Sequence, residues 1–170
     1  TGPQAFRDYY GALRAAVPQA ALLAPAVLAL AARAPAAPML LVDEQRLLHR
    51  SLHVLAAARH TPGFRPLVDL LTRPYAGLVL MLGPSWPAEA PGLLLGLFDG
   101  DPAPLFALAS NAEASGPARM AAMLVLARLV WEERASRASL LDLLDRMDRT
   151  DPAPLDSPVW LGFQNAIRLP

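Results

Sequence analysis

The chain has 170 residues, 54% of them hydrophobic, and its 15 basic residues, all Arg, balance 15 Asp and Glu. This neutral balance argues against a protein that follows a nucleic-acid backbone, and the absence of Cys excludes disulfides, thiolate zinc sites and cysteine nucleophiles. Because 33 Ala and 33 Leu dominate, whereas β-branched and aromatic residues are sparse, we expect one all-α domain over residues 1–170.

Proline and capping residues mark where helices are predicted to begin. Thr61, Asp101, Asp151 and Ser157 each precede a proline, so a side-chain acceptor stands ahead of a residue that suits the first helical turn. With hydrophobic spacing, these marks predict helices over 3–16, 19–33, 43–60, 61–71, 75–82, 90–98, 102–110, 117–133, 137–149 and 158–168. Pro-rich segments near 34–38 and 83–91 are predicted to break the chain.

The apolar run 20–32 is too short to span a bilayer, because its 13 residues fall below the about 20 that a span needs. The preceding stretch carries Arg7, Asp8 and Arg14, which is wrong for a signal peptide. We therefore expect a core helix, no membrane span, and a cytoplasmic protein, in agreement with the absence of Cys.

Short connections between short helices predict antiparallel packing of neighbours. Residues 64–71 resemble residues 103–108, about 40 positions later, which is close to the period of HEAT repeats. We expect a stack of antiparallel helical hairpins, a HEAT-like superhelix, with a closed helical bundle as the alternative.

The turn Asp99-Gly100-Asp101-Pro102 has two interpretations. Its paired carboxylates could hold a cation, but the further oxygen ligands of a calcium loop do not follow. The structural interpretation is that Gly100 ends one helix in a left-handed conformation and Asp101 caps the next. We favour the structural turn.

The three histidines, His49, His53 and His60, all fall in the predicted helix 43–60, within about 40° of one another around its axis. His49 and His53, at i and i+4, could share a metal ion, although the intervening Glu of a metalloprotease is absent. His60 would lie about 10 Å further along the axis and could not join them. The stripe is therefore structural, part of a groove that contacts a partner, or a metal site.

Signals of conventional enzymes are missing. No Ser lies in Gly-x-Ser-x-Gly, and no glycine-rich phosphate loop is present. Among the aromatic residues, Trp86 in its Pro-flanked segment is expected to be the most exposed, and hence a second candidate for partner contact.

Several segments resemble an uncharacterised bacterial family, catalogued as domain of unknown function 1186. These are 47–59 with 64–71, 94–105 with its Asp-Gly-Asp turn, the helix 117–130 behind it, and 157–160. The similarity runs from about Pro18 to Arg168 and implies HEAT-like helical pairs, but no catalytic residues. Some members continue into a Cys-rich metal-binding tail, which this chain without Cys does not carry.

These observations favour a non-enzymatic scaffold that binds another protein or a peptide and needs no cofactor. One alternative is a metal-dependent domain or enzyme that uses His49, His53 and a distant carboxylate. Another is a structural subunit that forms homodimers through surplus apolar surface, since the mean hydropathy is +0.31.

Overall fold

The computed structural model describes residues 3–34, 40–150 and 157–167, and this part of the chain contains helices and turns but no strand. The prediction of an all-α fold is confirmed. The helices are α1 (Pro3–Ala16), α2 (Ala20–Arg33), α3 (Val42–Ala57), α4 (Phe64–Leu71), α5 (Tyr75–Leu82), α6 (Trp86–Leu97), α7 (Ala103–Ser110), α8 (Gly116–Trp131), α9 (Arg137–Thr150) and α10 (Pro158–Ile167), with 3-10 turns η1 (Val17–Gln19) and η2 (Thr61–Gly63).

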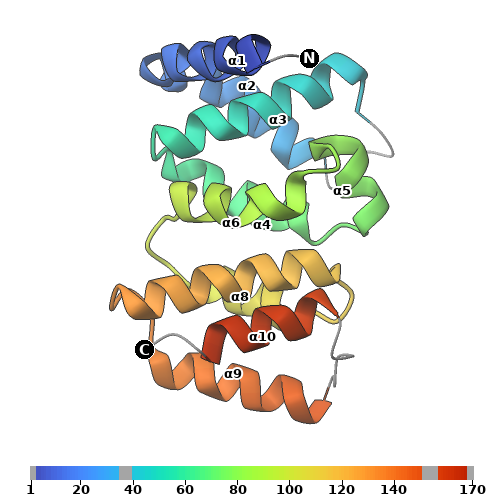
Figure 1. Ribbon diagram of the computed structural model, residues 1–170, viewed down its shortest axis with the longest axis vertical. Helices are drawn as coiled ribbons and strands as arrows, with labels where there is room; N and C mark the ends of the chain where they lie inside the picture. Colours follow the sequence, from blue (N-terminus) through green and yellow to red (C-terminus); the bar gives the residue numbers. More distant parts are fainter. Residues whose placement is uncertain (1–2, 35–39, 151–156, 168–170) are drawn as a thin grey trace.

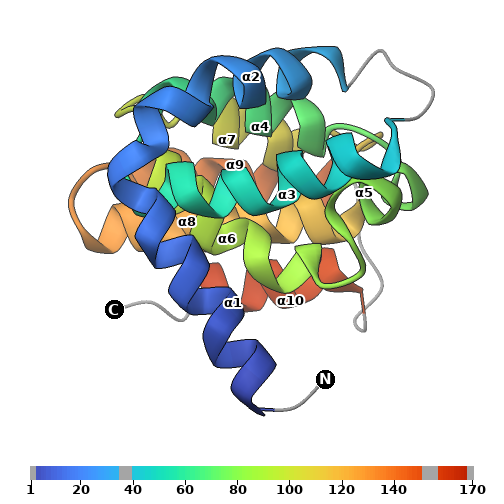
Figure 2. The same cartoon turned by 90° about the horizontal axis from the view of Figure 1, so that it is seen from above.

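The helices are stacked in two rows, with α1 and the α9–α10 pair at opposite ends (Figure 1). In one row α2, α4, α7 and α9 contact one another in that order, and in the other row α3, α6, α8 and α10 do so. Seen from above, the rows lie side by side, and α1 crosses the end of the stack at an angle (Figure 2). Apart from α5, which contacts α3 and α6 of the same row, consecutive helices from α2 to α10 alternate between the rows. The assignment to HEAT-like repeats stays a prediction.

The space between the rows is filled by one cluster of buried apolar side chains that runs from Ala20 to Val159. Helix α8 contacts α6, α7, α9 and α10 and is buried along most of its length. Its Arg119 is only 5% exposed, and its Nε donates to the carbonyl oxygen of Ala109 at 3.0 Å. The near-absence of polar residues in this segment agrees with its central place.

Helix α9 shows how the sequence pattern selects the buried face. Residues at helical spacing are buried: Leu140, Leu143, Leu144 and Met147. On the exposed side, Asp142 and Asp145 form i,i+4 ion pairs with Arg146 and Arg149. An acid placed four residues before a base is the favourable order on a helix surface.

The prediction of a chain break over 83–91 was wrong for most of its length. Only Gly83–Ser85 separates α5 from α6, and α6 begins at Trp86 with two prolines inside it. Pro87 lies in the first turn, where its missing N–H has no intrahelical acceptor, so Pro91 alone costs a helical hydrogen bond. Burial of apolar side chains along α6 offsets that cost. The other predicted break, at 34–38, lies outside the described residues except for Ala34.

The close contact between α3 and α6 depends on a glycine. A Cβ placed on Gly96 would lie 2.7 Å from the carbonyl oxygen of Ala56 and 2.9 Å from its Cβ. Any side chain here would push the helices apart, so Gly96 sets their separation. The same pair of helices carries the site described below.

By length and composition alone, the segment Gly11–Arg33 could cross a membrane, because it is 23 residues long and apolar. Only 28% of its most apolar window is buried, and Leu22 is 81% exposed. The core helix of a soluble protein and a signal sequence can have the same length and apolar composition. The expectation of no membrane span therefore stays a prediction.

Candidate functional site

His49 and His53 lie one turn apart on α3, and both side chains face Glu89 in α6. Residues at i and i+4 share a helix face, which places both imidazoles over the neighbouring helix of the same row. Glu89 lies in the first turn of α6. Two neighbouring helices therefore bring together three side chains that can coordinate a metal ion.

The donor atoms converge on one carboxylate oxygen. His49 Nε2 lies 2.9 Å from Glu89 Oε2, and His53 Nε2 lies 3.2 Å from the same atom. The imidazole rings meet edge to face, with centroids 5.1 Å apart. Ser85 Oγ donates to the other oxygen, Oε1, at 2.7 Å, and this bond orients the carboxylate so that Oε2 is left to the histidines.

Opposing effects act on the pKa of Glu89. Partial burial raises it, because desolvation penalises the charged form, but hydrogen bonds from His49 and Ser85 stabilise the carboxylate. The second effect prevails and the pKa lies below its ordinary value. Glu89 is consequently an anion at neutral pH, which is the form that binds a metal.

Two of the ligand-to-ligand distances in this cluster are close to those around a tetrahedral divalent ion. Ligands about 2.0–2.1 Å from a tetrahedral Zn²⁺ lie roughly 3.3 Å apart, near the two histidine–carboxylate distances. One donor atom from each of the three residues can be chosen so that all lie within 4.8 Å of one another. Within the described residues no further His, Asp or Glu joins this group. The site thus offers three protein ligands, and their side chains are 25%, 30% and 28% exposed.

The other two predicted contact residues lie elsewhere. Helix α3 ends at Ala57, so His60 is not on it, and its backbone N–H donates to the Leu55 carbonyl where the chain turns through Arg59 at φ 52°. The extension of the helix to residue 60 was wrong, because this turn ends it. Trp86 is 1% exposed and packs 5.9 Å from the Tyr75 ring, so its expected exposure was wrong as well. Since α6 begins at Trp86, the indole enters the core.

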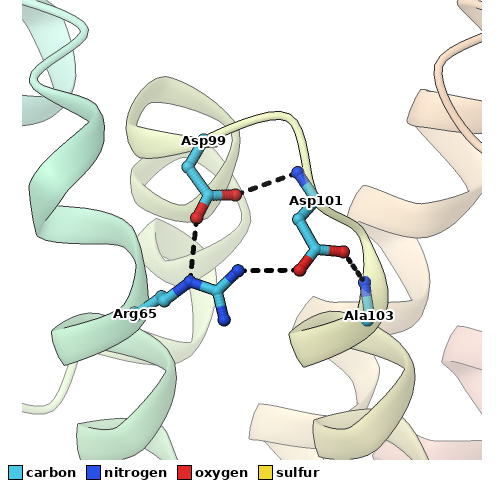
Figure 3. A network of polar contacts seen from close by, with 4 residues as sticks. All are labelled: Arg65, Asp99, Asp101 and Ala103. Carbon is cyan, nitrogen blue, oxygen red and sulfur yellow. Dashed lines mark hydrogen bonds and ion pairs between the residues drawn. The ribbon is translucent and has the colours of Figure 1, made fainter.

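The turn Asp99-Gly100-Asp101-Pro102 joins α6 to α7, and its carboxylates are engaged by the protein itself (Figure 3). Asp101 Oδ1 accepts the N–H of Ala103, and Asp99 Oδ1 accepts the N–H of Asp101, both at 3.0 Å. The remaining oxygens bind Arg65 of α4, at 3.1 Å from its Nε and 2.7 Å from its Nη2. Gly100 has φ 101°, in the left-handed region. The geometry is that of a structural turn.

Comparison with family models, with curated proteins and with solved structures finds no match to this chain. The resemblance to domain of unknown function 1186 stays a prediction.

A groove of about 450 Å³ lies between α3 and the helices α1 and α2. Its apolar lining includes Leu13, Leu23 and Leu47, and its polar lining includes Arg46 and Arg50. Both arginines lie on α3 three residues before a site histidine, so the groove and the histidine site flank one strip of the helix surface. The side chains of Arg46 and Arg50 on this strip are exposed.

Sequence reasoning missed Glu89 and Arg65. Glu89 was assigned to a chain break, and nothing local connects it with histidines 40 and 36 positions earlier. The pattern Ser85-x-x-x-Glu89 is a weak signal, since it places a donor one helical turn before a carboxylate. The sequence around Glu89 and Arg65 does not indicate which residues they contact.

Proposed function

We propose that this protein binds a divalent transition-metal ion through His49, His53 and Glu89. The observation that carries the proposal is the convergence of both imidazole nitrogens on Glu89 Oε2, at 2.9 and 3.2 Å, from two helices. Without an ion, each imidazole can instead donate to the carboxylate, so the same contact also supports the apo fold.

The donor set favours Zn²⁺ among the available ions. Imidazole suits Zn²⁺, Cu²⁺ and Ni²⁺, whereas Ca²⁺ and Mg²⁺ prefer an all-oxygen shell. Ser85 acts as the outer partner that holds the carboxylate in place, as such groups do around many metal ligands. Since α3 and α6 each supply ligands, the bound ion would join two neighbouring helices of one row.

The test is equilibrium dialysis of the tag-free protein against Zn²⁺, with bound metal measured by atomic emission. We expect close to one ion per chain for the wild type and for the matched control His60→Ala, which alters a histidine outside the cluster. We expect His53→Ala and Glu89→Gln to lose at least 10-fold in affinity. Equal binding by His53→Ala and His60→Ala would refute the site.

A second candidate function is that of a scaffold for a protein or peptide, organised as HEAT-like hairpins. The groove between α1, α2 and α3 favours it, because apolar side chains lie there beside charged ones, as in peptide-binding clefts. Peptides selected from a displayed library should lose binding to Leu47→Asp, in the groove, and keep binding to Leu80→Asp, which is exposed on α5 outside it. Equal binding to both variants would contradict a groove interaction.

A homodimer is the remaining alternative. Large apolar side chains are more than half exposed on α2, at the start of α3 and on α5: Leu22, Leu41, Val42 and Leu80. Light scattering over a range of concentrations tests it, since a constant monomer mass would exclude self-association.

A further inference from the structure

Within the described residues, the three-ligand site leaves a coordination position without a protein ligand. Structural zinc sites are closed by four protein ligands, whereas sites with three keep one position for water or another ligand. Within the described chain the metal-ligating group comprises only His49, His53 and Glu89. Each of these side chains is about one quarter exposed, so water reaches the cluster.

The charges around this position favour an anion. A divalent ion and the single carboxylate of Glu89 leave a net positive centre. Arg46 and Arg50 precede His49 and His53 by three residues each on α3, which makes each arginine a surface neighbour of one ligand. Arg46 also contacts Asp43 at 3.4 Å, but that carboxylate is almost fully exposed and the pair is weak.

We propose that the metal ion held by His49, His53 and Glu89 binds an exogenous carboxylate at its open position, and that Arg46 and Arg50 strengthen this binding. The inference rests on the proposed metal binding. Arginine suits this role, because its planar guanidinium matches a carboxylate and stays charged at every working pH. The carboxylate comes either from a small organic acid or from an acidic side chain of a peptide.

The experiment uses Co²⁺ in place of Zn²⁺, because the visible absorption of Co²⁺ responds to its ligands. The full chain is loaded with Co²⁺ and titrated with acetate at constant ionic strength. We expect a saturable spectral change. In Arg46→Gln/Arg50→Gln we expect acetate to bind about 3- to 10-fold more weakly while Co²⁺ affinity is retained. Arg137→Gln, on α9, is the matched control and should behave as the wild type.

The outcomes separate the two proposals. Failure of the wild type to bind Co²⁺ refutes the metal site itself. Binding of Co²⁺ with a spectrum that acetate does not change refutes the open position and leaves the metal site intact. An acetate affinity equal in the double variant and the wild type refutes the role of the arginines.

A further arm distinguishes the two sources of the carboxylate. The blocked tripeptide Gly-Glu-Gly replaces acetate in the same titration. Tighter binding of the peptide than of acetate assigns the position to an acidic side chain of a partner. Equal or weaker binding assigns it to a small organic acid.

Discussion

His49 Nε2 and Glu89 Oε2 lie 2.9 Å apart, although 40 positions separate the two residues in the chain. Their contact joins α3 to α6, and His53 approaches the same oxygen at 3.2 Å. The hydrogen bond from Ser85 holds the carboxylate in this orientation. The pair is an internal contact of the apo fold, and under the proposed function it would supply two metal ligands.

The apo protein should lose part of its stability in acid through Glu89. Because the folded-state pKa of Glu89 is lowered, its carboxylate stabilises the fold above the ordinary value of 4.5, and this contribution is lost as the pH falls through the folded pKa. Thermal melts in a chelator should show the wild type more stable than Glu89→Gln at pH 7, with the gap closing toward pH 3. Other carboxylates with lowered pKa, such as Glu44, are present in the wild type and in the variant, so their contributions cancel in the difference between the two melting temperatures. A gap that is constant with pH would contradict this role.

Zinc should raise the melting temperature, since a ligand that binds only the folded state stabilises it. At free Zn²⁺ 100-fold above Kd the gain is about 2.7 kcal/mol, or roughly 5–11 °C for a chain of this size. Chelation should reverse it. His60→Ala should keep the shift and His53→Ala should lose it, as measured by scanning calorimetry. An equal shift in both variants would point to binding elsewhere.

Gly96→Ala should be strongly destabilising. Its Cβ would meet backbone atoms of Ala56, and the cost of forcing α3 and α6 apart is about 1–3 kcal/mol. Gly92→Ala, one turn earlier on α6 with open space around it, is the matched control and should stabilise by about 0.5–1 kcal/mol. Urea unfolding measures both. Because the same helices hold the site, Gly96→Ala should also weaken Zn²⁺ binding.

The stabilisation that comes from the network around Arg65 should depend more on the bond by which Asp101 caps α7 than on the ion pairs of Arg65. The pKa of Asp101 is lowered first by the hydrogen bond from Ala103 N–H and then by Arg65. Asp101→Ala should therefore lower the melting temperature more than Arg65→Gln, because exposed ion pairs contribute little. Asp101→Asn, which keeps an acceptor, should fall between them. The reverse order would show that the ion pairs dominate.

Phe64→Ala should cost about 3–5 kcal/mol in the free energy of unfolding, because it empties a fully buried site. The Phe64 ring packs edge to face on Phe98, with centroids 5.4 Å apart, and this contact is lost as well. Leu22→Ala is the control, since its side chain is 81% exposed, and should change stability by less than about 0.5 kcal/mol. Chemical denaturation of both variants gives the comparison.

Helix positions were largely predictable, because their causes are local. The apolar run 75–82 matches α5 at both ends, and the cap at Asp101 places the start of α7 within one residue. The errors occurred where local signals conflict with packing. The prolines around Trp86 indicated a break, but α6 begins at this residue and its indole is buried in the core. Helix α3 ends at Ala57, and the chain turns at Arg59 before it reaches His60. No sequence pattern predicted this turn.

The sequence by itself determined the all-α fold and placed His49 and His53 on one helix face, because helical periodicity depends only on neighbours along the chain. The third member of the proposed site was decided only by tertiary structure. Glu89 reaches the histidines because Gly96 lets α6 approach the backbone of α3 closely. The close approach arises where two segments distant in sequence pack together, so it cannot be read from the sequence of either segment alone.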